Sequence, residues 1–172
     1  MTGKTHATAG ALAGIVFSKY TNEPMVMMTI FSVLGGLLPD IDSPESIIST
    51  ILFPIAKPWA IARKFFKKHK FKMLGDMFEH RGITHSLLPI LPLLIWRNII
   101  VLGLIVGILS HIAIDMLNDR GVPLLYPITT KRVHVLTITT GNWTENVFYG
   151  LLCIGTAIEF IGVDRIMMIW KG

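Results

Sequence analysis

The sequence predicts an all-α membrane protein, a polytopic bundle of short, partly kinked helices with one basic helix at the membrane surface. Apolar residues, with glycine counted in place of tyrosine, make up about 59% of the chain, against roughly 45–50% in soluble domains. Charged residues make up only 16%, where roughly 25% is usual. The apolar residues gather in segments 5–20, 25–38, 83–96, 99–114 and 147–163. The length of 172 residues fits a single domain, 1–172.

The first two segments, 5–20 and 25–38, are expected to form antiparallel helices. Lys4 precedes the first apolar run as in a signal peptide, but no convincing small-residue cleavage site follows, so we expect this segment to be retained. Gly10 and Gly14 are four residues apart, a spacing that lets helix backbones approach closely in lipid.

The stretch 57–75 holds seven of the sixteen Lys and Arg residues. It has Pro58 where a first helical turn accepts proline and Gly75 where a helix ends, with apolar side chains at roughly helical spacing between the lysines. We therefore predict a basic amphipathic helix on an anionic membrane surface. A solvated charged face is the alternative. No nucleic-acid-binding motif accompanies the patch, so we expect no nucleic-acid partner.

The three later segments complete the predicted bundle. Pro89 and Pro92 are expected to kink 83–96, which membrane helices tolerate. Gly103 and Gly107 repeat the small-residue spacing in 99–114. Residues 118–145 are predicted to form a loop with a short hairpin. Because each apolar segment is shorter than the roughly 20 residues of a comfortable span, an unusually apolar helical soluble protein is the alternative class.

Candidate metal ligands converge on one end of this predicted bundle. If each of the first four apolar segments crosses once, four positions share a side: the start of the first, the end of the second, the start of the third and the end of the fourth. Those positions hold His6, Asp40, Asp42, His80, His85, His111 and Asp115. Ionisable groups are costly beside hydrocarbon unless they are functional, so the convergence predicts a site. His69, inside the lysine-rich run, is expected to be a solvated surface residue, and His134 has no spaced partner, so both are left out.

The local spacings fit metal binding. His111 and Asp115 are four residues apart, on one helix face. Mixed imidazoles and carboxylates suit Zn²⁺, Mn²⁺ or Fe²⁺ better than Mg²⁺ or Ca²⁺. We expect one or two divalent ions, with zinc as the first choice. A proton pathway would use the same residue types.

Four ordered motifs resemble the YdjM-like family of membrane-bound metal-dependent hydrolases. They are Gly3 to His6, Gly36 to Ser43 (GLLPDIDS), His80 to Ser86 (HRGITHS), and Ser110 to Asp115 followed by RGVPLLYP, so that the resemblance covers about Gly3 to Pro127. The family is regarded as distantly similar to zinc-dependent phospholipase C and the P1-type nucleases, helical enzymes that hydrolyse phosphodiesters with clustered zinc ions. The resemblance therefore implies a metal cluster at the seven His and Asp positions. The soluble enzymes also use the N-terminal amine and a His-x-x-x-Glu motif. The His-x-x-x-Glu motif does not occur in this sequence.

As an enzyme, the chain is expected to hydrolyse a phosphoester, with an anionic membrane phospholipid as substrate and surface. A bound metal lowers the pKa of water from about 15.7 toward about 7, and Asp42 is favoured over Asp40 as the base. Arg81 or Arg120 would hold the phosphate, with lipid headgroup contact as the alternative role. Asn118 would orient a ligand.

The rival function is a non-enzymatic metal-binding or metal-transporting membrane protein. Transport would require ionisable residues deeper in the helices to relay ions. Glu159 is the carboxylate in the middle of an apolar segment, and the sequence shows no partner for it.

The charge distribution predicts a multi-pass protein of the cell membrane with its metal site at the cytoplasmic face. Twelve Lys and Arg residues fall on the metal side of the predicted topology and four on the other. Positive residues are retained on the cytoplasmic side of membrane helices. The oligomeric state is left open.

Overall fold

The computed structural model describes residues 1–43, 46–51, 58, 61, 64–65 and 81–162. Its α-helices are α1 (Gly3–Thr21), α2 (Met25–Leu37), α3 (Ile47–Ile51), α6 (Ile99–Asp115) and α7 (Trp143–Ile161). Its 3₁₀ helices are η1 (Leu38–Asp42), η2 (Ile83–His85) and η3 (Leu88–Ile95). Within these ranges the predicted all-α class is confirmed, since extended pairing is limited to two isolated bridges in the loop before α7. The predicted basic helix 57–75 lies largely outside the described residues.

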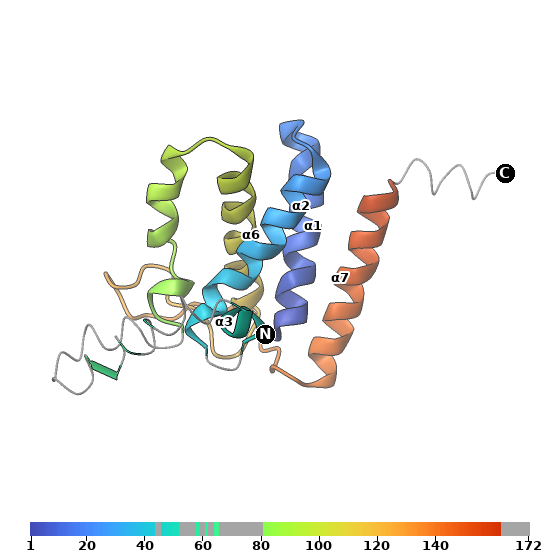
Figure 1. The fold of residues 1–172 in the computed structure, drawn as a ribbon. Helices are drawn as coiled ribbons and strands as arrows, with labels where there is room; N and C mark the ends of the chain where they lie inside the picture. The colour runs from blue at the N-terminus through green and yellow to red at the C-terminus, as the bar shows by residue number, and fades with distance from the viewer. Residues whose placement is uncertain (44–45, 52–57, 59–60, 62–63, 66–80, 163–172) are drawn as a thin grey trace.

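Helices α1, α2 and α6 pack against one another as a triad. α2 returns antiparallel to α1, and α6 runs in the direction of α2, so the start of α1 lies at the same end as the ends of α2 and α6 (Figure 1). A Cβ atom on Gly107 would lie 2.1 Å from the carbonyl oxygen of Ser32, and one on Gly10 would lie 2.6 Å from the same oxygen. Only glycine permits such close backbone contact, so the small-residue spacings mark real helix contacts.

The outer faces of the helices are apolar, whereas polar groups are buried inside. Val26 on α2, Ile100 on α6 and Leu151 on α7 are among the exposed large apolar side chains. Such a surface is typical of a chain that faces hydrocarbon. One described segment, Met25–Asp42, is long and apolar enough to cross a membrane, with a mean hydropathy of 1.5 over 18 residues. α6 is apolar but has only 17 residues.

The segment 83–96 differs from the prediction. A kinked α-helix was expected, but the chain forms η2 and then η3. η3 has Pro89 near its start and Pro92 inside it. Each proline removes a backbone donor and clashes with the carbonyl four residues earlier, so a regular α-helix does not form here. The prediction of an α-helix over this segment is wrong.

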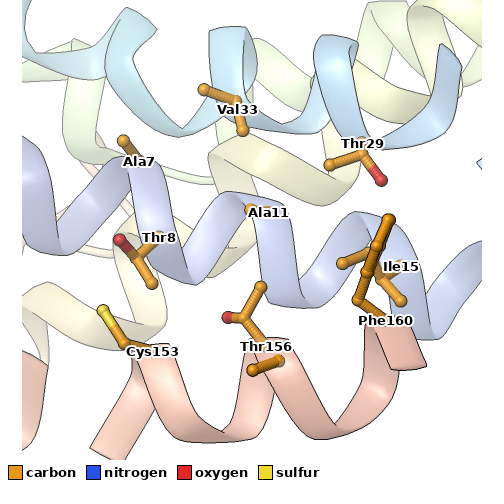
Figure 2. Close-up of a pocket in the computed structure, with 10 residues that line it drawn as sticks. Ala7, Thr8, Ala11, Ile15, Thr29, Val33, Cys153, Thr156 and Phe160 are labelled. Atoms are coloured by element: carbon orange, nitrogen blue, oxygen red, sulfur yellow. The ribbon is translucent and has the colours of Figure 1, made fainter. Parts of the chain in front are cut away.

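Helix α7 packs against α1, at the edge of the triad (Figure 1). An apolar groove of about 510 Å³ runs between α7, α1 and α2. Figure 2 shows its lining, which includes Ala11, Val33 and Cys153. Toward the far end of α7, Lys19 Nζ lies 2.6 Å from Glu159 Oε2. Glu159 therefore has the partner that the sequence did not reveal.

Candidate metal centre

Five of the predicted ligands meet at one end of the triad. They are His6 in the first turn of α1, Asp40 in η1, His85 at the end of η2, and His111 and Asp115 near the end of α6. The three imidazoles are fully buried and Asp115 is 1% exposed, whereas the Asp40 side chain is 14% exposed. The structure therefore brings together residues from four elements, and the cluster opens toward Asp40.

The ligand atoms form two overlapping groups. Those of His6, His111 and Asp115 lie within 4.8 Å of one another, and so do those of Asp40, His85 and His111. His111 belongs to both groups. Two groups that share one histidine can hold one ion or two.

Hydrogen bonds fix the orientation of two of the imidazoles. Nδ1 of His111 lies 2.7 Å from the carbonyl oxygen of Gly36; because a carbonyl only accepts, Nδ1 carries the proton. Nδ1 of His85 lies 3.0 Å from Thr84 Oγ1, whose own proton goes to Asp42 Oδ2. A neutral ring with either of these contacts carries its lone pair on Nε2. These two Nε2 atoms face each other at 3.1 Å.

His6 presents its ring to the same cluster. It stacks on His111 with ring centroids 3.7 Å apart and planes 15° apart. Its Nε2 lies 3.3 Å from Asp115 Oδ1. Within the described part of the chain, neither ring nitrogen of His6 has a hydrogen-bond partner. A fully buried imidazole without such a partner is unusual, and a bound cation would satisfy it.

Asp42 lies beside the cluster and orients one of its members. Its carboxylate accepts the Thr84 hydroxyl and lies 3.9 Å from Nδ1 of His85, on the ring edge opposite the cluster. Carboxylates in this position hold a metal-binding histidine in its correct tautomer. The geometry therefore favours Asp40 over Asp42 as a direct ligand.

Arg81 reaches Asp115 from the chain that precedes η2. Its Nη2 lies 3.0 Å from Asp115 Oδ2, and its buried Nε has no hydrogen-bond partner among the described residues. The backbone of Arg81 has a φ of 63°, a left-handed conformation that non-glycine residues rarely adopt.

The other predicted polar residues lie around Arg81 or outside the cluster. Asn118 accepts from Arg81 Nη1 at 3.5 Å and from the backbone of Arg120 at 3.0 Å. Asn118 therefore orients Arg81 rather than a ligand. Arg120 is exposed, and its role in holding a phosphate stays a prediction. His80 lies outside the described residues, and His134, left out of the predicted site, is exposed.

Two groups at this end were missed by sequence reasoning. The amine of Met1 lies 2.6 Å from Asp115 Oδ1 and is buried. Glu145, in the first turn of α7, is 1% exposed. A carboxylate in a first helical turn is ordinary, so no sequence signal distinguishes Glu145 from a surface residue.

Comparison with known proteins agrees with the membrane character of the chain. It is 28% identical over 166 residues to "Uncharacterized protein YvsG" of Bacillus subtilis (strain 168), covering 93% of this chain and 94% of that protein. It is 37% identical over 126 residues to "Inner membrane protein YdjM" of Escherichia coli (strain K12), covering 66% of this chain and 57% of that protein. The same values hold for the Shigella flexneri protein of that name.

No solved structure matches the chain at a significant level. Residues 1–170 match the family described as "YdjM inner membrane protein". The match covers nearly the whole sequence and includes all seven predicted ligands. The chain therefore belongs to the YdjM inner membrane protein family.

Proposed function

We propose that this chain is a membrane-bound metal-dependent hydrolase that acts on a phosphoester, with an anionic phospholipid as substrate. One observation carries the proposal: Nε2 of His85 and Nε2 of His111 face each other at 3.1 Å inside a buried cluster. Two lone pairs at this distance repel unless a proton or a metal ion neutralises them. Carboxylates of Asp40 and Asp115 approach the same nitrogens at 3.6 to 3.9 Å, which favours a divalent cation.

The donor set fits a transition metal. Imidazole nitrogen and carboxylate oxygen are the ligands typical of Zn²⁺, with Mn²⁺ and Fe²⁺ as alternatives. His6, His111 and Asp115 would hold one ion, and Asp40, His85 and His111 would hold a second or share the first. A bound ion of this kind supplies a water whose pKa is lowered to about 7, which provides a nucleophile at neutral pH.

The residues around the cluster suit a phosphoester. The buried Nε of Arg81, which has no hydrogen-bond partner among the described residues, is a donor that a phosphate oxygen would satisfy. Asp40 is the member of the cluster that solvent reaches, so substrate would enter past it. We therefore assign Asp40, rather than Asp42, as the group that accepts the proton of the attacking water. Asp42 holds His85 in place through Thr84.

The membrane placement explains the choice of a lipid. We place α1, α2, α6 and α7 across the cell membrane, with the cluster at the cytoplasmic face. Each Lys or Arg near an anionic leaflet adds about 1 kcal/mol of attraction, and the stretch 57–75 carries seven of them. The basic stretch would hold the open side of the cluster against lipid headgroups.

Metal analysis tests the cluster. Detergent-purified protein should contain one or two zinc ions per chain, and the double variant His111→Ala, Asp115→Ala should contain none. His134→Ala is the matched control, because this histidine is exposed, and it should keep the wild-type metal content. Equal, sub-stoichiometric metal in wild type and double variant would remove the proposal.

Lipid turnover tests the reaction. In proteoliposomes that contain phosphatidylglycerol, the wild type should release a phosphorylated headgroup or phosphate without an ion gradient. Asp40→Asn should lose this release, while the ion held by His6, His111 and Asp115 stays bound. Metal flux with no turnover across a broad panel of lipids would instead favour a transporter. Against transport, the buried ionisable side chains of the described residues lie at one end of the bundle and form no path through it.

Topology is tested by thiol labelling. A cysteine placed at Asn22, in a Cys153→Ser background, should react with an impermeant maleimide only from the side of the membrane opposite the cytoplasm. Asn22 lies between α1 and α2, at the end opposite the cluster. Labelling from the cytoplasmic side alone would overturn the assigned orientation.

A further inference from the structure

The carboxylate of Glu145 binds the start of α1 from a distant part of the chain. Its Oε1 accepts the Thr2 backbone N–H at 2.6 Å and the hydroxyls of Thr2 and Thr5 at 2.8 Å each. Its Oε2 accepts the Gly141 N–H at 2.6 Å. The residue is 1% exposed, so these four donors replace the water that a buried carboxylate would otherwise require.

The contact of Glu145 with Thr2 and Thr5 replaces a local N-cap hydrogen bond. Thr2 is the N-cap of α1, yet its side chain makes no capping hydrogen bond within the helix. It donates instead to Glu145. A negative charge at this position also interacts favourably with the free N–H groups of the first turn. Glu145 therefore fixes the first turn of α1 in place of a local side chain.

His6 belongs to that same first turn. It follows Thr5 directly, and its backbone N–H donates to the carbonyl of Thr2 at 3.2 Å. Its ring has no hydrogen bond of its own among the described residues, so its position depends on the backbone that carries it, on stacking against His111 and on the 3.3 Å contact of its Nε2 with Asp115 Oδ1. A shift of this turn would move His6 away from His111 and Asp115.

We infer that Glu145 is a positioning residue of the metal centre, which holds His6 in register by clamping Thr2 and Thr5 at the start of α1. The inference rests on the proposed metal centre. It assigns a role in metal binding to α7, which contributes no side chain to either ligand group.

The fold offers a matched control at the other end of the same helix pair. Glu159 also ties α7 to α1, through Lys19 at 2.6 Å, but far from His6. If Glu145 only docks α7, then Glu145→Gln and Glu159→Gln should affect metal binding alike. If it positions His6, only Glu145→Gln should weaken the site. Glutamine keeps one acceptor oxygen, so its NH₂ group faces either the Gly141 N–H or the donors of Thr2 and Thr5, and the paired contact is lost.

The experiment is a Co²⁺ titration of detergent-purified full-length protein, read from the visible absorption bands of the metal. Glu145→Gln should lower the affinity by about 10- to 100-fold, as other residues that orient metal ligands do, and should change the band shape. Thr5→Val, which removes one donor at constant shape, should show a smaller effect in the same direction. Glu159→Gln should match the wild type in affinity and spectrum. Equal affinities in Glu145→Gln and Glu159→Gln would overturn the inference.

Hydrogen exchange at residues 3–6 separates this inference from the proposed function. Glu145→Gln should increase exchange there, and Glu159→Gln should not, whether or not the wild type binds Co²⁺. If the wild type binds no metal, the proposed function fails. If exchange at residues 3–6 is unchanged in a folded Glu145→Gln protein, the positioning role itself fails.

Discussion

The α1–α2–α6 triad and helix α7 are built from similar apolar helices but are held in place by opposite means. In the triad, glycines bring backbones into direct contact, so that a single added carbon at Gly107 would meet three backbone atoms of α2 within 2.8 Å. On α7, Gly150 has nothing within 4 Å of its Cβ position. α7 is tied to α1 by polar contacts near its two ends, at Glu145 and Glu159, and an apolar groove lies between them.

This difference matches a division of roles, because the triad carries metal ligands and α7 does not. The ligand groups come from the triad and from the 3₁₀ segments η1 and η2 that adjoin it. The ligands of the triad are carried by helices whose backbones pack so closely that there is no room for a Cβ atom at Gly10, Gly35 or Gly107. α7 approaches the site end through the buried carboxylate of Glu145 and through Phe148 and Leu152, which pack against Ala9 and Ile114.

The largest effect is expected from Gly107→Ala. The new methyl group would collide with the carbonyl oxygen of Ser32 and with the backbone of Gly35 and Gly36, which should cost about 3 kcal/mol of stability. Thermal unfolding in detergent measures the loss. Gly150→Ala is the control and should raise stability by about 0.5–1 kcal/mol, because alanine is the better helix former. Similar midpoints for the two variants would show that the backbone at Gly107 is packed no more tightly than the backbone at Gly150.

Metal removal should act on the triad and spare α7. An ion present at about 100 times its dissociation constant stabilises the folded state by about 2.7 kcal/mol. Chelation should therefore increase hydrogen exchange in η1 and in the last turns of α6, which carry Asp40 and His111. Exchange at the middle of α7 should not change. An increase spread evenly over α7 and the triad would show that the two regions respond as one.

Glu159→Gln should have a small effect that depends on salt. The side chains of Lys19 and Glu159 are 46% and 35% exposed, and such ion pairs contribute about 0.2–1 kcal/mol. The midpoint of unfolding should fall slightly at low ionic strength and be indistinguishable from wild type at high ionic strength. A loss that persists in high salt would mean that this contact holds α7 more firmly than its exposure implies.

The smallest effect is expected from Ala157→Phe. Ala157 lines the groove and is exposed, so a ring has room there and stability should stay within about 0.5 kcal/mol of wild type. Ala9→Phe is the contrasting variant, because Ala9 is 5% exposed and packed in the core, and it should be clearly destabilising. A marked loss in Ala157→Phe would show that α7 closes on α1 more tightly than the groove suggests.

Hydropathy and crossing order were enough to predict much of this arrangement. The apolar segments 5–20, 25–38 and 99–114 became α1, α2 and α6 with small changes at their ends. Counting crossings placed His6, Asp40 and His111 at one end, where they now lie within one cluster. Both inferences use apolar segments and their order along the chain, and the folded structure retains both.

The failures have physical causes of their own. Pro89 and Pro92 were treated as kinks, although two prolines three residues apart leave too few backbone donors for an α-helix. The role of Asp42 as the base stays a prediction, and sequence spacing does not show that its carboxylate accepts the Thr84 hydroxyl. Glu145 was missed because its partners, Thr2 and Thr5, are more than 100 residues away in the chain.

The groove also contains a cysteine that can carry a spectroscopic label. Cys153 is the one cysteine of the chain, and it lies on α7 facing α1 across the groove (Figure 2). A nitroxide attached to this thiol would be the sole spin label on an unmutated protein. With Mn²⁺ in the proposed centre, the dipolar coupling between the two spins would measure the distance from α7 to the metal site directly in a bilayer.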